Sequence, residues 1–443
     1  MTNTMDQTAL FQAFEHFKAG RLEQAAELLR QFLNGARFHS AANHLLGGIY
    51  YRQGKYTAAR EHLERACAAP DATPEMFNNY GAVLKLLGDA AGAIAAYRRA
   101  LALDPNYADA FNNLGVVYRA QGMTGKAIES FRRAVALKPE LAEARENLRA
   151  ACNDVIPAWH FAMMNDRPRN DAYQDAIARL VPGKRVLEIG TGTGLLAMMA
   201  ARAGATSVTT CEAVTLIAER AREIIARNGF AERIRVIDGH STNLTVGGTL
   251  AERAQILVTE TFSSDLLSEG ILPALEHAHA HLLTADAIVI PRQAAARAFL
   301  IGGTEIEGLL FAGPSNGFDL SPFNEFAPSI LAVSMNNIDH EVLSADFELV
   351  RFDLAERSFP MESRPLSVTV TKAGVAAGLV QWICLDLDGL SHYENRPSSG
   401  PRTENHWTQI LHRFPSPLAV NAGDAVRLMV RHNRQQISVD LIE

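Results

Sequence analysis

The sequence predicts a multidomain chain in three parts: an all-α solenoid, an α/β domain with a Rossmann-like parallel sheet, and a mostly β domain built as a barrel. Three observations predict this architecture. Small residues recur every 34 residues in the front third, strands and helices alternate around a glycine-rich turn in the middle, and strand-like runs between Gly, Pro and Asn turns fill the carboxyl third. A chain of 443 residues holds two or three domains, which we place at 6–153, 154–290 and 291–443.

The front third is a repeat array. Its 34-residue period is carried by two sets of small residues, which are Gly20, Gly54, Gly88, Gly122 and Ala25, Ala59, Ala93, Ala127. This is the tetratricopeptide (TPR) pattern, in which each helix–turn–helix unit has small residues where its helices touch. Four repeats and a polar capping helix over 141–152 account for the first domain.

Solenoids of this kind present a concave groove that binds peptides or protein tails. We therefore expect an unidentified peptide or protein partner in the TPR groove. Paired asparagines recur on the first helices of two repeats and are candidates to hold a ligand backbone; they are Asn78, Asn79, Asn112 and Asn113. The alternative is an array that only spaces or dimerises the rest of the chain.

The middle third contains a strand, a glycine turn and a helix in succession. Residues 186–189 are typical of a buried strand, and the Ala-rich run 195–203 begins a helix whose amino end faces the turn. Gly190, Gly192 and Gly194 let the backbone approach a ligand closely. A dinucleotide fingerprint has its third glycine three residues after the second, whereas here it follows after two. This spacing argues against a pyrophosphate and resembles the turn of methyltransferases that bind S-adenosylmethionine.

Two further strands lead to candidate ligand contacts. The strand 207–211 ends in Glu212, at the position where an acid holds a ribose diol. A surface glutamate that caps the next helix is the alternative. The strand 234–238 leads into the loop 239–243, which we expect to lie over the adenine.

A pair of glutamates follows the next strand, 254–258. Glu260 and Glu269 lie on the loop that leaves the carboxyl edge of the predicted sheet, where open α/β sheets bind their ligands. Two carboxylates brought together repel each other unless a cation lies between them. A guanidinium is planar, permanently charged and suited to paired charge-assisted hydrogen bonds. The pair predicts an arginine side chain as substrate, with two ordinary solvated glutamates as the alternative.

From residue 159 to residue 409 the chain resembles the protein arginine N-methyltransferase family. Five separated blocks carry the resemblance: 162–173, the glycine turn with Glu212, the loop of Glu260 and Glu269, the junction 290–291, and 405–407. They are similar to the family's cofactor-covering helix, its first two motifs, its double-E loop, its entry into the β-barrel and its Thr-His-Trp loop. Within the family the chain is closest to the monomethylating (type III) and TPR-bearing branches.

The resemblance implies a cofactor and the residues that bind it. The cofactor is S-adenosyl-L-methionine, and its expected contacts are His160, Met163, Arg169, Glu188, Gly190, Gly192, Gly194, Glu212, Ser241 and Thr242. Arg169 would pair with the methionine carboxylate, a role that suits its rigid donor fork. Ser241 or Thr242 would contact the adenine, although many family members have a glutamate there.

The resemblance also assigns the catalytic groups. Glu260 and Glu269 would grip the substrate guanidinium, and His406 paired with Asp166 would form the dyad that relays the proton. Trp407 would line the arginine channel; packing between the domains is its alternative role.

The charge and composition of the chain limit the classes of partner that it can bind. A net charge of −7 and a pI near 6.1 argue against nucleic acid and suit protein substrates with exposed arginines. The cysteines lack C-x-x-C spacing and the histidines at 277, 279 and 281 lack the H-E-x-x-H pattern, so no metal is expected. No apolar run reaches 18 residues, so we expect no membrane contact and a cytoplasmic location. The stretch 302–326 falls where the family has its dimerisation arm, so a homodimer is an expectation.

Two other functions remain open on the sequence alone. One is a methyltransferase with a different acceptor, although a neutral acceptor would leave both glutamates without a cation. The other is a TPR adaptor with a non-catalytic methyltransferase domain, although the retained glutamates and the 405–407 block argue against it.

Overall fold

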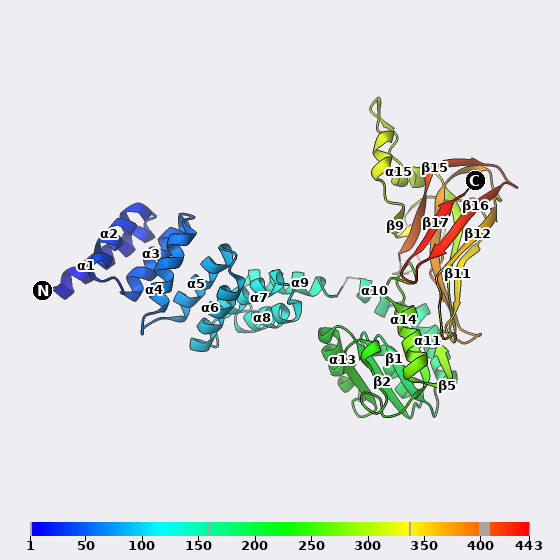
Figure 1. Cartoon of the computed structure of the whole chain (residues 1–443), viewed down its shortest axis with the longest axis horizontal. Helices are drawn as coiled ribbons and strands as arrows, with labels where there is room; N and C mark the ends of the chain where they lie inside the picture. The colour runs from blue at the N-terminus through cyan, green and yellow to red at the C-terminus, as the bar shows by residue number, and fades with distance from the viewer. Residues whose placement is uncertain (1, 157–158, 336–337, 398–407, 443) are drawn as a thin grey trace. The chain divides into compact units, whose positions relative to one another are not determined.

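The computed structural model describes residues 2–156, 159–335, 338–397 and 408–442. It contains two compact units, Met1–Pro157 and Ala158–Glu443 (Figure 1). The first unit holds the repeats, and the second holds both the parallel sheet and the β-rich domain.

The described part of the first unit is entirely helical. Its helices are α1 (Thr2–Lys18), α2 (Leu22–Gly35), α3 (Ser40–Arg52), α4 (Tyr56–Cys67), α5 (Pro74–Leu86), α6 (Ala90–Leu103), α7 (Ala108–Ala120), α8 (Thr124–Leu137) and α9 (Ala142–Asn153). The recurring glycines end the first helix of each pair with φ between +70° and +81°, a conformation that favours glycine. The recurring alanines are fully buried between helices. Both sets confirm the predicted repeat, and α9 lies where the capping helix is expected.

The asparagines of the repeats do not all face a ligand. Asn78 and Asn112 are buried, and each accepts a hydrogen bond at 3.0 Å, from Asn113 and Asn147 respectively. Because both bonds join one repeat to the next, Asn78 and Asn112 hold the array together. Asn79 is bonded to another repeat too, through His44 at 2.8 Å.

The second unit begins with a five-stranded parallel sheet in the order β3-β2-β1-β4-β5. The strands are β1 (Arg185–Ile189), β2 (Ser207–Glu212), β3 (Ile234–Asp238), β4 (Ala254–Thr259) and β5 (Leu283–Ile290). Its helical segments are α10 (Trp159–Met164), α11 (Arg167–Leu180), α12 (Leu195–Arg202), α13 (Thr215–Arg227), η1 (Ser241–Asn243) and α14 (Ile271–His281). The predicted strands and the helix after the glycine turn are confirmed, and β1 and β4 are neighbours.

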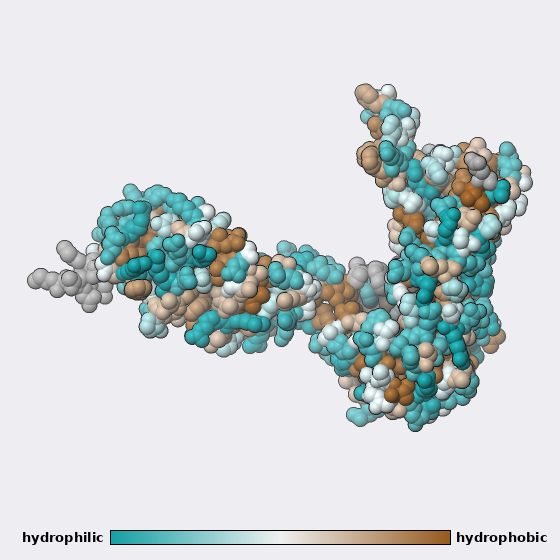
Figure 2. Space-filling view, viewed as in Figure 1, coloured by the Kyte–Doolittle hydropathy of each residue, from teal (hydrophilic) through white to brown (hydrophobic). Residues whose placement is uncertain are grey.

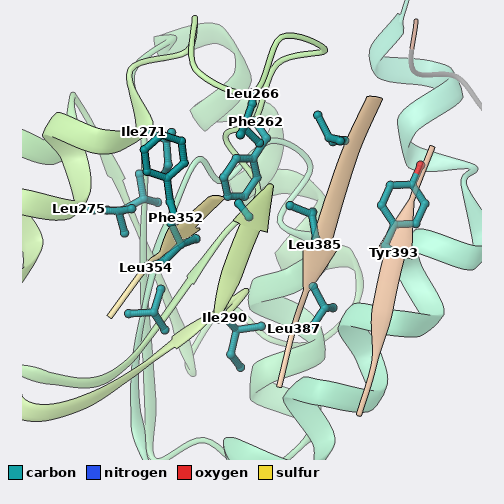
Figure 3. Close-up of a cluster of buried hydrophobic side chains, with 14 of the residues drawn as sticks. Phe262, Leu266, Ile271, Leu275, Ile290, Phe352, Leu354, Leu385, Leu387 and Tyr393 are labelled. Carbon is teal, nitrogen blue, oxygen red and sulfur yellow. The ribbon is translucent and has the colours of Figure 1, made fainter. Parts of the chain in front are cut away.

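The carboxyl third is an antiparallel β-rich domain. Its larger sheet has the order β10-β6-β13-β15-β9, with β11 on β6 and β14 on β13, and its smaller sheet has the order β12-β16-β17. The strands are β6 (Gln293–Gly302), β9 (Ile330–Val333), β10 (Glu341–Val342), β11 (Phe347–Asp353), β12 (Glu362–Thr369), β13 (Gly374–Asp386), β14 (His392–Glu394), β15 (Gln409–Val420), β16 (Ala425–His432) and β17 (Ile437–Leu441). One apolar core runs from the parallel sheet into these strands, as Figure 3 shows for Phe262, Ile290 and Leu385. The two halves are therefore fixed against each other.

An arm projects from the β-rich domain around α15 (Thr304–Leu310) (Figure 1). It continues through a short hairpin of β7 (Pro314–Ser315) and β8 (Phe318–Asp319) into η2 (Ser321–Phe326). Its surface mixes apolar and hydrophilic residues (Figure 2), and Phe318, Phe323 and Phe326 are 71%, 69% and 73% exposed. Exposed aromatic residues in such a cluster mark an interaction surface.

Candidate active site

The candidate site lies at the carboxyl edge of the parallel sheet, where β4 ends beside β1. Thr259 is held from two sides, since its hydroxyl donates to the last carbonyl of β1 at 3.1 Å and its own carbonyl accepts the Tyr173 hydroxyl at 2.9 Å. Gly190 has φ +86°, and a Cβ there would lie 2.5 Å from the Thr261 side chain. Glycine is therefore required where the two loops cross, and Glu260 leaves a firmly anchored edge.

A buried arginine holds Glu260. The Arg169 Nε donates to Glu260 Oε1 at 2.8 Å, and its Nη2 lies 2.6 Å from Oε2. The two side chains are only 4% and 7% exposed. This fork is the strong, two-point form of an ion pair. The arginine predicted to bind the cofactor carboxylate therefore contacts one glutamate of the double-E loop.

Glu269 differs from Glu260 in its exposure to solvent and in its surroundings. Its surroundings desolvate it and the negative charges of Glu260, Asp265 and Glu212 lie nearby, and together these raise the pKa of Glu269 to about 7. The side chain does reach solvent, but it does so inside a concave pocket whose walls limit its hydration. A carboxyl group with a pKa near neutrality in a cleft is a candidate functional group.

The pocket that Glu269 lines has a volume of about 450 Å³. The double-E loop supplies its polar side, including Asp265, and β9, β15 and β17 supply an apolar side with Ile330, Ile410 and Ile437. None of the lining residues that the structure describes is Lys or Arg. Sequence reasoning missed Asp265, although a third acid in the same loop was a usable signal.

Asp166 begins α11 and is 3% exposed. Its Oδ1 accepts the backbone N–H of Arg169 at 3.1 Å, and its Oδ2 accepts the hydroxyl of Tyr393 on β14 at 2.6 Å. A lone tyrosine in a short strand belongs to no motif, so Tyr393 could not be singled out from the sequence. His406 and Trp407 lie outside the residues that the structure describes, so the predicted dyad and channel wall stay predictions.

The glycine turn and Glu212 meet at the same sheet edge. Glu212 Oε2 accepts the Gly192 N–H at 3.1 Å, and its Oε1 accepts the Val214 N–H at 3.0 Å. Gly192 has φ +51°, and no atom lies within 4 Å of the position that a Cβ would take. Open space above the turn beside a carboxylate fits a ligand with ribose hydroxyls.

Glu188 lies inside the fold. It is 1% exposed on β1. Its Oε2 has no hydrogen-bond partner among the described residues. Burial raises the pKa of Glu188 to about 8, with the nearby Glu212 adding to the effect. Its predicted contact with the cofactor stays a prediction.

The other predicted cofactor contacts lie on short helices and at the end of the turn. His160 and Met163 are half-buried on α10, Ser241 is buried and Thr242 is exposed on η1. Gly194, with φ +80°, precedes α12. These placements agree with the predicted order of motifs, but the individual contacts stay predictions.

The described part of the chain holds neither a cluster of metal ligands nor a membrane-spanning helix. No three of its His, Cys, Asp or Glu side chains form a group that would hold a metal ion. The rings of His277 and His281 are 4.9 Å apart on α14, and His279 contacts the Leu354 carbonyl. None of the helices in the described ranges is long and apolar enough to cross a membrane.

Models of known families match separate parts of the chain. Tetratricopeptide repeat models match residues 12–74, 81–122 and 108–141. A model of ribosomal protein L11 methyltransferase (PrmA) matches residues 174–270. The arginine methyltransferase oligomerization subdomain matches residues 310–441, which include the arm beyond α15.

Curated relatives match the second unit. The chain is 39% identical over 275 residues to an arginine N(omega)-methyltransferase of Streptomyces achromogenes subsp. streptozoticus, a match that covers 62% of this chain and 75% of that protein. It is 33% identical over 299 residues to protein arginine N-methyltransferase 7 of Danio rerio, covering 61% and 44%. The corresponding Xenopus laevis protein is 32% identical over 290 residues, covering 59% and 42%. The chain thus spans less than half the length of these two relatives.

Two solved structures share the fold. A Trypanosoma brucei PRMT1 enzyme–prozyme complex with AdoHcy is 23% identical with a TM-score of 0.56, and it covers 66% of this chain and 95% of that one. Arabidopsis thaliana protein arginine methyltransferase 10 is 20% identical with a TM-score of 0.53, and it covers 66% and 93%. At these identities the likeness concerns the fold alone.

Proposed function

The chain belongs to the arginine N-methyltransferase family, and from this premise we propose that it methylates guanidino nitrogens of arginine residues in proteins. The observation that supports this most directly is the state of the double-E loop. Glu260 is already ion-paired with Arg169, and the pKa of Glu269 is raised to about 7 by desolvation and by its acidic neighbours. Acids held this close together ionise more easily when a cation is bound, which favours a cationic substrate.

The residues at the sheet edge fit S-adenosyl-L-methionine, the cofactor of this enzyme class, which supplies an electrophilic methyl group when bound. Glu212 would hold the ribose hydroxyls against the glycine turn at Gly192. Arg169 would pair with the cofactor's carboxylate through its donor fork. Ser241 and Thr242 would border the adenine.

Catalysis would consist mainly of positioning. Glu260 and Glu269 would hold the guanidinium and keep its positive charge on the nitrogens that are not methylated. The remaining nitrogen keeps lone-pair character for attack on the methyl group. A guanidinium is not deprotonated in free solution near neutral pH, so the proton would leave after transfer, with His406 and Asp166 as the relay.

Free arginine is a second candidate acceptor. The Streptomyces relative is named for arginine, whereas the vertebrate relatives are named for protein arginine. Free arginine carries an α-carboxylate, which needs donors or a cation when it is bound. The described lining of the pocket beside Glu269 contains two acids, apolar residues and neutral polar side chains, but no Lys or Arg. The lack of a cation in this described lining favours an arginine whose carboxyl group is part of a peptide bond.

We also propose that the TPR array recruits a protein partner and that the chain forms a homodimer through the arm. Residues 1–157 carry 18 Lys and Arg against 16 Asp and Glu, whereas residues 158–443 carry 24 against 33. The acidic excess therefore lies on the unit with the double-E loop, where it would attract basic substrates. The three exposed phenylalanines of the arm supply an apolar contact surface.

The test is incubation with methyl-labelled S-adenosylmethionine and either an arginine-rich protein mixture or free arginine, followed by amino-acid analysis. We expect label in methylarginine from the protein hydrolysate, and the mono-, symmetric or asymmetric form would identify the branch. Label only in free arginine would favour the second candidate. Glu260→Gln and Glu269→Gln are each expected to reduce transfer at least about 100-fold while S-adenosylhomocysteine still binds. Full activity in both variants would contradict the double-glutamate mechanism.

A further inference from the structure

Tyr393 reaches from the β-rich domain to Asp166, the N-cap of the helix that carries Arg169. It lies on β14 at the margin of the apolar core, and its hydroxyl points away from Leu385 and Leu387 (Figure 3). The hydroxyl donates to Asp166 Oδ2 at 2.6 Å. Both side chains are buried, with exposures of 6% and 3%. A hydrogen bond to a buried carboxylate is among the stronger kinds in proteins.

Asp166 transmits this contact to the double-E loop. Its Oδ1 caps α11 by accepting the Arg169 N–H at 3.1 Å. The Arg169 guanidinium in turn contacts both carboxylate oxygens of Glu260, at 2.8 and 2.6 Å. A continuous series of contacts therefore joins Tyr393 to Glu260. Burial and the Asp166 acceptor raise the pKa of Tyr393, so its hydroxyl keeps the proton that it donates.

A second contact ties α11 to the same part of the β-rich domain but lies at the other end of the helix. Arg179 Nε donates to Asp388 Oδ2 at 2.7 Å. Arg179 also contacts Ser391, the residue just before β14. These bonds dock the helix without involving Asp166. A variant at this end of α11 can therefore weaken the contact between the helix and the β-rich domain without changing the contacts of the first turn.

We propose that Tyr393 is a positioning residue for methyl transfer: by holding Asp166 it fixes the first turn of α11 and so orients Arg169 toward Glu260 and toward the cofactor's carboxylate. The inference rests on the proposed function, because it needs Arg169 to bind the cofactor. Without the phenol hydroxyl, the buried Asp166 carboxylate loses one of its hydrogen-bond donors. The first turn of the helix, and Arg169 with it, is then held less firmly.

The test begins with Tyr393→Phe, which keeps the ring and its packing and removes only the hydroxyl. We expect the Kd of S-adenosylhomocysteine, measured by titration calorimetry, to rise roughly ten- to a hundredfold. We expect kcat/KM for an arginine peptide to fall by at least the same factor. The matched control is Asp388→Asn, which weakens the other tie between α11 and the β-rich domain. It should lower Tm but leave Kd and kcat/KM within about twofold of the wild type.

A double-variant cycle identifies the route of the effect. Because Tyr393 acts through Asp166, adding Tyr393→Phe to Asp166→Asn should change the Kd by less than about twofold. A wild-type Kd in Tyr393→Phe, or independent effects that multiply in the double variant, would overturn the proposal. If Asp166→Asn does not fold, equal Kd changes in Tyr393→Phe and Asp388→Asn would overturn it instead. If the wild type methylates no arginine, the proposed function fails, while the Kd comparison still decides the role of Tyr393.

Discussion

Methyl transfer to an arginine acceptor is expected to weaken about tenfold as the pH falls from 8 to 6, because Glu269 takes up a proton over that range. The pKa of Glu269 is about 7, raised by desolvation and then by Glu260, Asp265 and Glu212. The ionised fraction is about nine-tenths at pH 8, one half at pH 7 and about one-tenth at pH 6. The guanidinium stays charged throughout. The loss at low pH therefore comes from the enzyme and appears in kcat/KM.

Asp265 provides the perturbation that tests the cause. Asp265→Asn removes one of the charges that raise the pKa of Glu269. The asparagine keeps an oxygen at Oδ1 to accept the backbone N–H groups of Leu267 and Ser268, which lie 3.2 and 3.1 Å away. The loop should therefore hold its shape while the acid limb moves to lower pH. We expect a displacement on the order of half a pH unit.

The assay is kcat/KM for an arginine peptide from pH 5.5 to 8.5 at constant ionic strength, with saturating S-adenosylmethionine. S-adenosylhomocysteine binding over the same range is the control, because it separates cofactor affinity from acceptor affinity. A profile that is flat between pH 6 and 8 would refute the assignment. An acid limb that Asp265→Asn does not move, or that persists in the residual activity of Glu269→Gln, would assign the titration to another group.

Three further outcomes follow from the same structure. Burial raises the pKa of Glu188 in the folded state to about 8, against an ordinary value of 4.5. The folded state therefore favours the protonated carboxyl group, and ionisation of Glu188 makes the fold progressively less stable as the pH rises from 4.5 to about 8. Glu188→Gln should therefore raise Tm at pH 9, by an amount that corresponds to at most roughly 5 kcal/mol, and should leave Tm unchanged at pH 4. A Cβ on Gly81 would lie 2.7 Å from the buried Tyr97 ring, so Gly81→Ala should lower the free energy of unfolding, measured by calorimetry, by roughly 1–3 kcal/mol. Gly125 is the control, because no atom lies within 4 Å of the position that a Cβ there would take. Gly125→Ala should raise the free energy of unfolding by about 0.5–1 kcal/mol. Arg169→Lys keeps the charge but loses the fork, so its Kd for S-adenosylhomocysteine should rise about tenfold or more.

Local patterns in the sequence predicted most of the fold. Parallel strands buried on both faces are near-continuous apolar runs, which is why β1 and β4 were found within a residue or so of their ends. The TPR period was equally plain, because a positive φ after every first helix restricts that position to glycine. The role of the repeated asparagines could not be predicted in this way. Their recurrence is evident in the sequence, but Asn78 and Asn112 are buried and hydrogen-bonded to helices that follow them in the array.

Several contacts within the candidate site could not be predicted from the sequence. Glu260 and Arg169 were both singled out, yet they are 91 residues apart and nothing local indicates that they contact each other. Tyr393 and Asp166 are 227 residues apart, and the tyrosine belongs to no motif. Which long-range partners meet depends on the packing of the β-rich domain against α11. That packing arises from the whole core, and no short segment encodes it.

The charge state of the double-E loop also bears on which acceptor it selects. Glu260 is ion-paired with Arg169, whereas the pKa of Glu269 is raised to about 7 by desolvation and by the nearby charges of Glu260, Asp265 and Glu212. A neutral acceptor would leave these like charges uncompensated. A lysine ammonium would let Glu269 ionise, but it is a compact point charge without a rigid fork that spans two carboxylates. A guanidinium supplies both the charge that favours ionisation and the planar set of donors. In the proposed mechanism the two glutamates would therefore discriminate by charge and by geometry together, which favours arginine as the acceptor.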